Sequence, residues 1–110
     1  MQINNAKQHE EIKKYIDENE VVLFIKGTAQ IPQCGFSATV VQIFDRLGVK
    51  YKDVNILENN LREELKVFSD WPTFPQVYVR KQFIGGCDIT REMYQSGELQ
   101  QLFKENNKVA

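Results

Sequence analysis

Apolar and polar residues follow the periods of helices and strands along this chain. Residues 5–19 place Ile12, Tyr15 and Ile16 in a charged background, which predicts a surface helix with a narrow apolar stripe. Residues 21–25 form an uninterrupted apolar run, Val-Val-Leu-Phe-Ile. This run predicts a strand that is buried on both faces of a sheet.

The next stretch loses its apolar period and then regains it. Residues 27–33 contain a glycine and a proline and predict a loop. From residue 36 to 47 the helical period returns, and Gly48 is a residue type that commonly ends helices. Residues 51–56 predict a second strand. We expect the apolar side of the helix to be buried; it consists of Phe36, Val40, Val41, Phe44 and Leu47.

The second half of the chain predicts a hairpin between helices. Residues 61–68 carry apolar side chains at helical spacing. Residues 71–75 contain two prolines, which remove backbone donors and exclude a regular helix or a central strand. Residues 76–79 and 82–84 then predict a hairpin around Arg80-Lys81.

Glycines and polar residues delimit the last two helices. Gly85-Gly86 predicts a tight turn, and Asp88 is a suitable N-cap for the helix that follows. Residues 96–97 separate this helix from a last one, and we expect the polar tail from about Glu105 to fray. The order of elements predicts one α/β domain, residues 1–110, with a four-stranded mixed sheet flanked by helices and a parallel first strand pair.

Composition and charge narrow the class of protein. The 110 residues are near the usual size of one domain, and 42% apolar with 26% charged residues is typical of a soluble globular protein. A net charge of −1 argues against nucleic acid or a membrane surface as a partner. Two cysteines favour a reducing compartment. We expect a bacterial cytoplasm or, if a leader was removed, a mitochondrial or plastid interior.

Cys34 is the strongest candidate for chemistry. It follows the loop and opens the predicted helix, so its thiol faces free N–H groups and the positive end of the helix dipole. We expect its pKa to fall below the usual ~8.5, which favours the thiolate that attacks sulfur and binds iron. The alternative role is a small buried hydrophobe, but Gly35 and the preceding loop argue against deep packing.

Ser37 occupies the position where a second cysteine would complete a C-x-x-C redox pair. Such a pair closes its own disulfide, whereas a lone thiol needs a second thiol or binds something soft, such as a metal. No G-x-S-x-G elbow or partnering base accompanies Ser37. We therefore expect its hydroxyl to bond nearby backbone rather than act as a nucleophile.

Two stretches are open to more than one interpretation. A cis bond at Pro75 would leave the backbone of Phe74 free to pair with an extended peptide, although a trans turn is the commoner arrangement. Gly85-Gly86-Cys87-Asp88 opens a helix and presents N–H groups to an anion. Asp88 caps that helix or holds an ammonium, and Cys87 is a packing thiol or a second redox partner.

Three further charged or titratable residues are weaker candidates for a functional role. Lys26 and Arg62 are candidate carboxylate binders, although each alone is more often a solvated surface charge. His9 lies on the first helix, where we expect it to be solvated. The sequence therefore predicts no Cys/His metal cluster.

With these residues in view, the chain resembles the monothiol glutaredoxins of the CGFS type, which have the thioredoxin fold. The resemblance runs from about Val21 to Phe103 and rests on four motifs in the family's order. These are Lys26-Gly27 with the long loop to Pro32-Gln33, Cys34-Gly35-Phe36-Ser37, Trp71-Pro72-Thr73-Phe74-Pro75-Gln76 and Gly85-Gly86-Cys87-Asp88.

The resemblance implies a groove that binds glutathione. Lys26 and Arg62 would take the glycyl carboxylate, with Lys66 a weaker candidate one helical turn on. Phe74, before a cis-Pro75, would pair with the cysteinyl backbone as a strand would.

At the other end of the tripeptide, the N–H groups of Cys87 and Asp88 would hold the γ-glutamyl carboxylate, and the Asp88 side chain its ammonium. The family also implies a [2Fe–2S] cluster that bridges two protomers. Its four ligands would be Cys34 from each chain and the thiols of two glutathione molecules. The apo protein is then expected to be a monomer.

Three functions compete on this basis. The first is a carrier that delivers a [2Fe–2S] cluster to apo iron–sulfur proteins. The second is a glutathione-dependent thiol–disulfide oxidoreductase, at most weakly active, in which Cys34 attacks a glutathionylated protein and a second glutathione or Cys87 resolves the mixed disulfide. The third is an adaptor with neither role. The long loop and Ser37 favour the carrier.

Overall fold

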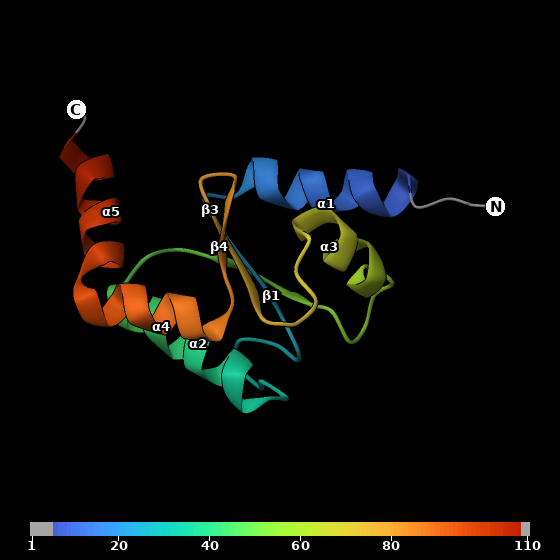
Figure 1. The fold of residues 1–110 in the computed structure, drawn as a ribbon, viewed down its shortest axis with the longest axis horizontal. Helices are drawn as coiled ribbons and strands as arrows, with labels where there is room; N and C mark the ends of the chain where they lie inside the picture. The colour runs from blue at the N-terminus through green and yellow to red at the C-terminus, as the bar shows by residue number, and fades with distance from the viewer. Residues whose placement is uncertain (1–5, 109–110) are drawn as a thin grey trace.

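The computed structural model describes residues 6–108 of the chain. Within that range the elements follow the predicted order, and each apolar run forms the element expected of its period (Figure 1). They are α1 (Ala6–Glu18), β1 (Val21–Ile25), α2 (Gly35–Leu47), β2 (Lys52–Asn55), α3 (Arg62–Ser69), β3 (Gln76–Val79), β4 (Gln82–Gly85), α4 (Cys87–Ser96) and α5 (Glu98–Lys108).

The four strands form one mixed sheet in the order β2-β1-β3-β4. β1 pairs in parallel with β2, with Val22 opposite Lys52. It pairs in antiparallel fashion with β3, with Val22 opposite Tyr78, and β3 and β4 form the hairpin. The predicted four-stranded mixed sheet is confirmed. Its central strand β1 is the apolar run, since this strand has neighbours on both edges.

Helices cover both faces of the sheet, and this explains why β1 is buried along its whole length. Figure 1 shows α1 and α3 on one side of the strands and α2 and α4 on the other. Leu23 packs in a cluster with Phe44 of α2, whereas its neighbour Phe24 packs in a second cluster with Ile12 of α1. Successive strand residues point to opposite faces, so an uninterrupted apolar run serves both cores.

Two expectations from the sequence are wrong. Phe36 was expected on the buried side of α2, but its side chain is 60% exposed because it lies in the first turn of the helix. His9 was expected to be solvated, but it is half-buried and its Nδ1 lies 3.2 Å from Oε2 of Glu64. The last helix runs to Lys108, and the fraying of the polar tail from about Glu105 stays a prediction.

None of the helices in residues 6–108 is long and apolar enough to cross a membrane.

Candidate functional site

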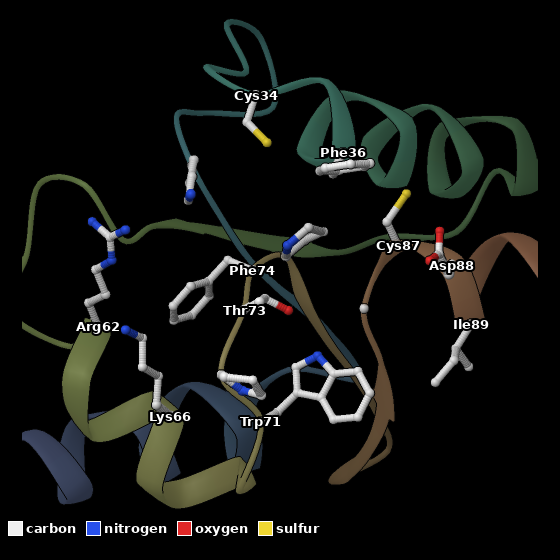
Figure 2. Close-up of a pocket in the computed structure, with 14 residues that line it drawn as sticks. Cys34, Phe36, Arg62, Lys66, Trp71, Thr73, Phe74, Cys87, Asp88 and Ile89 are labelled. Atoms are coloured by element: carbon white, nitrogen blue, oxygen red, sulfur yellow. The ribbon is translucent and has the colours of Figure 1, made fainter.

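A groove of about 750 Å³ gathers the motif residues that lie far apart in the sequence. Figure 2 shows Cys34 from the start of α2 above Thr73 and Phe74, with Cys87 and Asp88 of α4 to one side and Arg62 and Lys66 of α3 to the other. All residues that the resemblance assigned to glutathione or the cluster line it: Lys26, Cys34, Arg62, Lys66, Phe74, Pro75, Cys87 and Asp88.

Cys34 is the N-cap of α2, and its side chain is partly exposed in the groove. Partial burial on its own raises the pKa of a thiol. Here the hydrogen bonds from the backbone of Ser37 and Phe36, the Ser37 hydroxyl and the charge of Lys26 outweigh burial and lower the pKa of Cys34. The predicted direction is confirmed. A lowered pKa and partial exposure favour a reactive thiol at Cys34 over a packing thiol.

Ser37 is fully buried, and its hydroxyl accepts a hydrogen bond from the backbone N–H of Lys26 at 3.1 Å. This agrees with the prediction that Ser37 bonds to backbone, although its partner lies 11 positions earlier rather than in its own turn. Ser37, at the position of the second cysteine of a C-x-x-C pair, therefore links the end of β1 to the first turn of α2.

The loop between β1 and Cys34 is held by hydrogen bonds at both ends. The N–H of Gln33 donates to the carbonyl of Lys26 at 2.8 Å, and the N–H of Ala29 donates to Oδ2 of Asp53 on β2 at 2.8 Å. Gly27 has a φ of 95°, and a Cβ there would lie 2.5 Å from backbone atoms of Gln33 and Ile31. Only glycine fits this close turn, which brings the chain back toward the sheet before Cys34.

The floor of the groove is the segment before β3, and it contains the cis peptide bond Phe74–Pro75. The cis geometry that the resemblance implied is therefore present. A buried residue holds this segment from behind: the side-chain amide of Gln76 donates to the carbonyls of Trp71 at 3.2 Å and Thr73 at 3.4 Å. Gln76 belongs to a motif of the resemblance, but this supporting role was not predicted because glutamine is normally a surface residue.

The start of α4 forms the opposite wall. The N-cap of α4 is Gly86, not Asp88, so the prediction that Asp88 caps the helix is wrong. Asp88 lies in the first turn, where an acidic residue interacts favourably with the helix dipole. Its Oδ1 accepts a hydrogen bond from Arg91 at 2.8 Å, and most of its side chain faces solvent.

Cys87 differs from Cys34 in its environment. Its side chain is buried, and burial raises the pKa of the Cys87 thiol; the neighbouring Asp88 and Cys34 act in the same direction, while Arg91 opposes them. Nη1 of Arg91 lies 3.8 Å from its sulfur. The groove therefore holds two thiols whose pKa values shift in opposite directions, that of Cys34 downward and that of Cys87 upward.

Charge is divided between the two ends of the groove. Figure 2 shows Arg62 and Lys66 at one end and Asp88 at the other, with Phe74 between them. Lys26 also lines the groove. Lys66 makes an exposed ion pair with Glu63 at 3.4 Å. An extended ligand with an anionic end and a cationic group at its other end would match this arrangement.

Residues that the resemblance did not assign also line the groove. They are Phe36, Trp71, Pro72, Thr73, Gly86 and Ile89. All of them except Ile89 belong to the motifs of the resemblance, so their place near the site could have been predicted from those motifs. Nothing in the sequence indicated that Ile89 lines the groove, because an apolar residue in the first turn of a helix is ordinarily part of the core.

No group of three or more His, Cys, Asp or Glu side chains that could hold a metal ion occurs among the residues that the structure describes. One chain by itself therefore offers a soft metal a single accessible thiolate, that of Cys34.

Comparisons with known proteins agree with this geometry. Residues 21–84 match the family model described as Glutaredoxin. The chain is 54% identical over 99 residues to Probable monothiol glutaredoxin 2 of Rickettsia typhi, covering 89% of each chain. It is 50% identical over 97 residues to Glutaredoxin 4 of Escherichia coli K12, covering 87% of this chain and 84% of the relative.

A solved structure shows the same fold at high identity. The solution structure of reduced poplar apo GrxS14 is similar with a TM-score of 0.78 and 53% identity, over 88% of this chain and 90% of the poplar chain. With one activated cysteine at the start of α2 and serine at the third position after it, the chain belongs to the glutaredoxin family, as a monothiol member.

Proposed function

We propose that this glutaredoxin binds glutathione in the groove and, together with a second copy, carries a [2Fe–2S] cluster that it delivers to apo iron–sulfur proteins. Membership of the monothiol glutaredoxins supports a glutathione-dependent role in redox or iron–sulfur chemistry. The observation that carries the finer proposal is the groove itself. In it the thiol of Cys34, whose pKa is lowered, lies between a cationic end and an acidic end.

Glutathione matches the division of charge along the groove. It has a glycyl carboxylate at one end, a γ-glutamyl carboxylate and ammonium at the other, and a thiol between them. We assign the glycyl carboxylate to Lys26 and Arg62, with Lys66 nearby. Arginine suits this role because its planar guanidinium can bind a carboxylate through two hydrogen bonds.

The middle and far end of the ligand have separate partners in this proposal. The backbone of Phe74 next to cis-Pro75 pairs with the cysteinyl residue as a neighbouring strand would. The N–H groups of Cys87 and Asp88, in the first turn of α4, hold the γ-glutamyl carboxylate. The exposed Asp88 carboxylate then binds the ammonium.

The donor set fits a shared cluster better than a cluster held by one chain. A [2Fe–2S] cluster needs four ligands, usually thiolates, and each chain supplies Cys34 alone. Two protomers and two glutathione thiols complete the set. Half of these ligands are exchangeable small molecules, which suits a protein that releases its cargo. We therefore propose an apo monomer and a cluster-bridged dimer, working in the cytoplasm of a bacterium or in an organelle interior.

A second function is favoured by the low pKa of Cys34. As an oxidoreductase, the Cys34 thiolate would attack the glutathione sulfur of a glutathionylated protein, forming a Cys34–glutathione disulfide and releasing the protein thiolate. The thiolate of a second glutathione would attack the bound glutathione sulfur, which frees the Cys34 thiolate and yields glutathione disulfide. Cys87 lines the same groove and is the alternative resolving thiol.

Anaerobic reconstitution with iron, sulfide and glutathione tests the proposal. Visible absorption and circular dichroism report the cluster, and size-exclusion chromatography reports the dimer. We expect cluster bands and a dimer only with glutathione present and Cys34 intact. Cys87→Ser is the matched control and should retain both, because Cys87 is buried and its pKa is raised. A colourless monomer that still binds glutathione would overturn the carrier in favour of the oxidoreductase.

A further inference from the structure

The side chain of Asn55 joins two loops that lead to the groove. Its Oδ1 accepts a hydrogen bond from the N–H of Gly27 at 3.0 Å and a second from the N–H of Leu57 at 3.0 Å. Gly27 is the second residue of the loop that leads from β1 to Cys34, and Leu57 is the second residue of the connection from β2 to α3. One carbonyl oxygen thus fixes the start of both connections.

These two connections carry the cations assigned above to the glycyl carboxylate. Lys26 directly precedes Gly27, and Arg62 is the first residue of α3, at the end of the connection that contains Leu57. Both cations line the groove. A displacement of either loop would therefore change the distance between the two charges.

The position of Asn55 in the sheet explains why it reaches both loops. It is the last residue of β2 and lies opposite Ile25, the last residue of the parallel strand β1. Parallel strands end at the same edge of a sheet, so the side chain at the end of β2 lies beside both departing loops. Asn55 is only partly exposed, and both amide groups would lose their partner without it.

We propose that Asn55 is a positioning residue that sets the spacing of Lys26 and Arg62 and thereby the recognition of the glycyl carboxylate. This inference rests on the proposed glutathione site. It adds to that site a residue that makes no contact with the ligand and that lies outside the four motifs of the resemblance. If Asn55 only stabilised the fold, its replacement would not change the preference of the groove for a ligand with a charged glycyl end over a ligand with a neutral one.

The test compares two ligands on three forms of the protein. Reduced wild type, Asn55→Ala and Asn55→Ser are titrated by NMR with glutathione and with glutathione ethyl ester, which is neutral at the glycyl end. We expect wild type to prefer glutathione by about tenfold, the usual value of a charged hydrogen-bonded contact. Both variants should lose most of this preference while keeping their affinity for the ester. The shorter side chain of Asn55→Ser leaves room for water, so this variant provides the test if Asn55→Ala does not fold.

Asn19→Ala is the matched control. The Asn19 side chain donates to the carbonyl of Tyr15 at 2.9 Å on the α1 side of the fold, and its removal should leave the preference unchanged. Variants of Asn55 that keep the wild-type preference, or that lose affinity for both ligands equally, would overturn the inference and leave the glutathione site standing. A wild type that does not distinguish the two ligands would overturn the carboxylate site itself.

Discussion

The backbone N–H of Lys26 donates a hydrogen bond to the hydroxyl of Ser37 at 3.1 Å, and Ser37 is fully buried. Ser37 also donates from its backbone and side chain to Cys34, which lowers the pKa of that thiol. The residue that replaces the second cysteine of a C-x-x-C pair therefore holds a groove cation in place and stabilises the neighbouring thiolate. Its role is structural and electrostatic, not nucleophilic.

Replacing Ser37 with alanine tests this dual role. The N–H of Lys26 would lose its acceptor, which we expect to lower the free energy of unfolding by about 1–3 kcal/mol. One hydrogen bond to the thiolate would also be lost, so the pKa of Cys34 should rise. The pH dependence of iodoacetamide alkylation measures this pKa. Ser69→Ala, which removes a hydroxyl bonded to the carbonyl of Leu65, should leave the alkylation profile unchanged.

The two thiols of the groove should differ in reactivity. The pKa of Cys34 is lowered and that of Cys87 is raised, so near neutral pH iodoacetamide should modify Cys34 first. Mass spectrometry of peptides taken at successive times measures the order. Equal rates, or faster modification of Cys87, would contradict the assignment of Cys34 as the activated thiol.

The lowered pKa of Cys34 should also make the free energy of unfolding depend on pH. The folded state holds the pKa of Cys34 below its unfolded value, so the unfolded chain binds more protons between the two pKa values. Stability from the thiolate should therefore rise with pH through this window and reach its full size above the unfolded pKa of ~8.5. Denaturant unfolding of wild type and Cys34→Ser at a series of pH values measures it, and the gap between them should widen as pH rises.

Replacing Asp88 with alanine separates ligand binding from helix stability. Asp88 makes no cap hydrogen bond, and its ion pair with Arg91 is largely exposed. We expect little change in the thermal unfolding midpoint but about a tenfold weaker affinity for glutathione, since a charged partner of the ammonium is lost. Calorimetric titration measures the affinity. Asp17→Ala, an exposed acidic residue on α1, is the control, and an equal loss there would refute a specific role for Asp88.

Phe44 should be the most sensitive side chain of α2. It is fully buried, with its ring centroid 6.4 Å from that of Phe103 and 6.5 Å from that of Tyr51. Phe44→Ala should lower the free energy of unfolding by about 3–5 kcal/mol through the cavity that it leaves. Leu57→Ala, at a half-exposed position, should cost far less in the same denaturant titration.

The order of elements and the position of the thiol followed from the sequence because both depend on local patterns. The apolar run at 21–25 is the central strand, and Cys34 caps the following helix. Apolar periodicity reports which elements can be buried, and a cysteine at a helix start experiences the free N–H groups wherever the helix packs. The mixed sheet was predictable because a β-α-β unit gives parallel strands and a short hairpin gives antiparallel ones.

Local patterns failed where a residue's surroundings depend on distant parts of the chain. Phe36 continues the apolar side of its helix, but the first turn of α2 extends over the groove and leaves the ring exposed. His9 lies on a charged helix, but α3 packs against that helix and brings Glu64 to it. Asp88 suits an N-cap by residue type, but the backbone places the cap at Gly86.

The sequence by itself therefore determined the elements, their order and the presence of one activated thiol. Only the tertiary structure decided that Lys26, Arg62 and Asp88 line one groove with Cys34, and that Gln76 and Asn55 support it from behind. The physical reason is that periodicity and helix-end electrostatics act over a few residues, whereas a binding groove is made by contacts between segments up to 62 positions apart, as from Lys26 to Asp88. Those contacts exist only once the helices have packed on the two faces of the sheet.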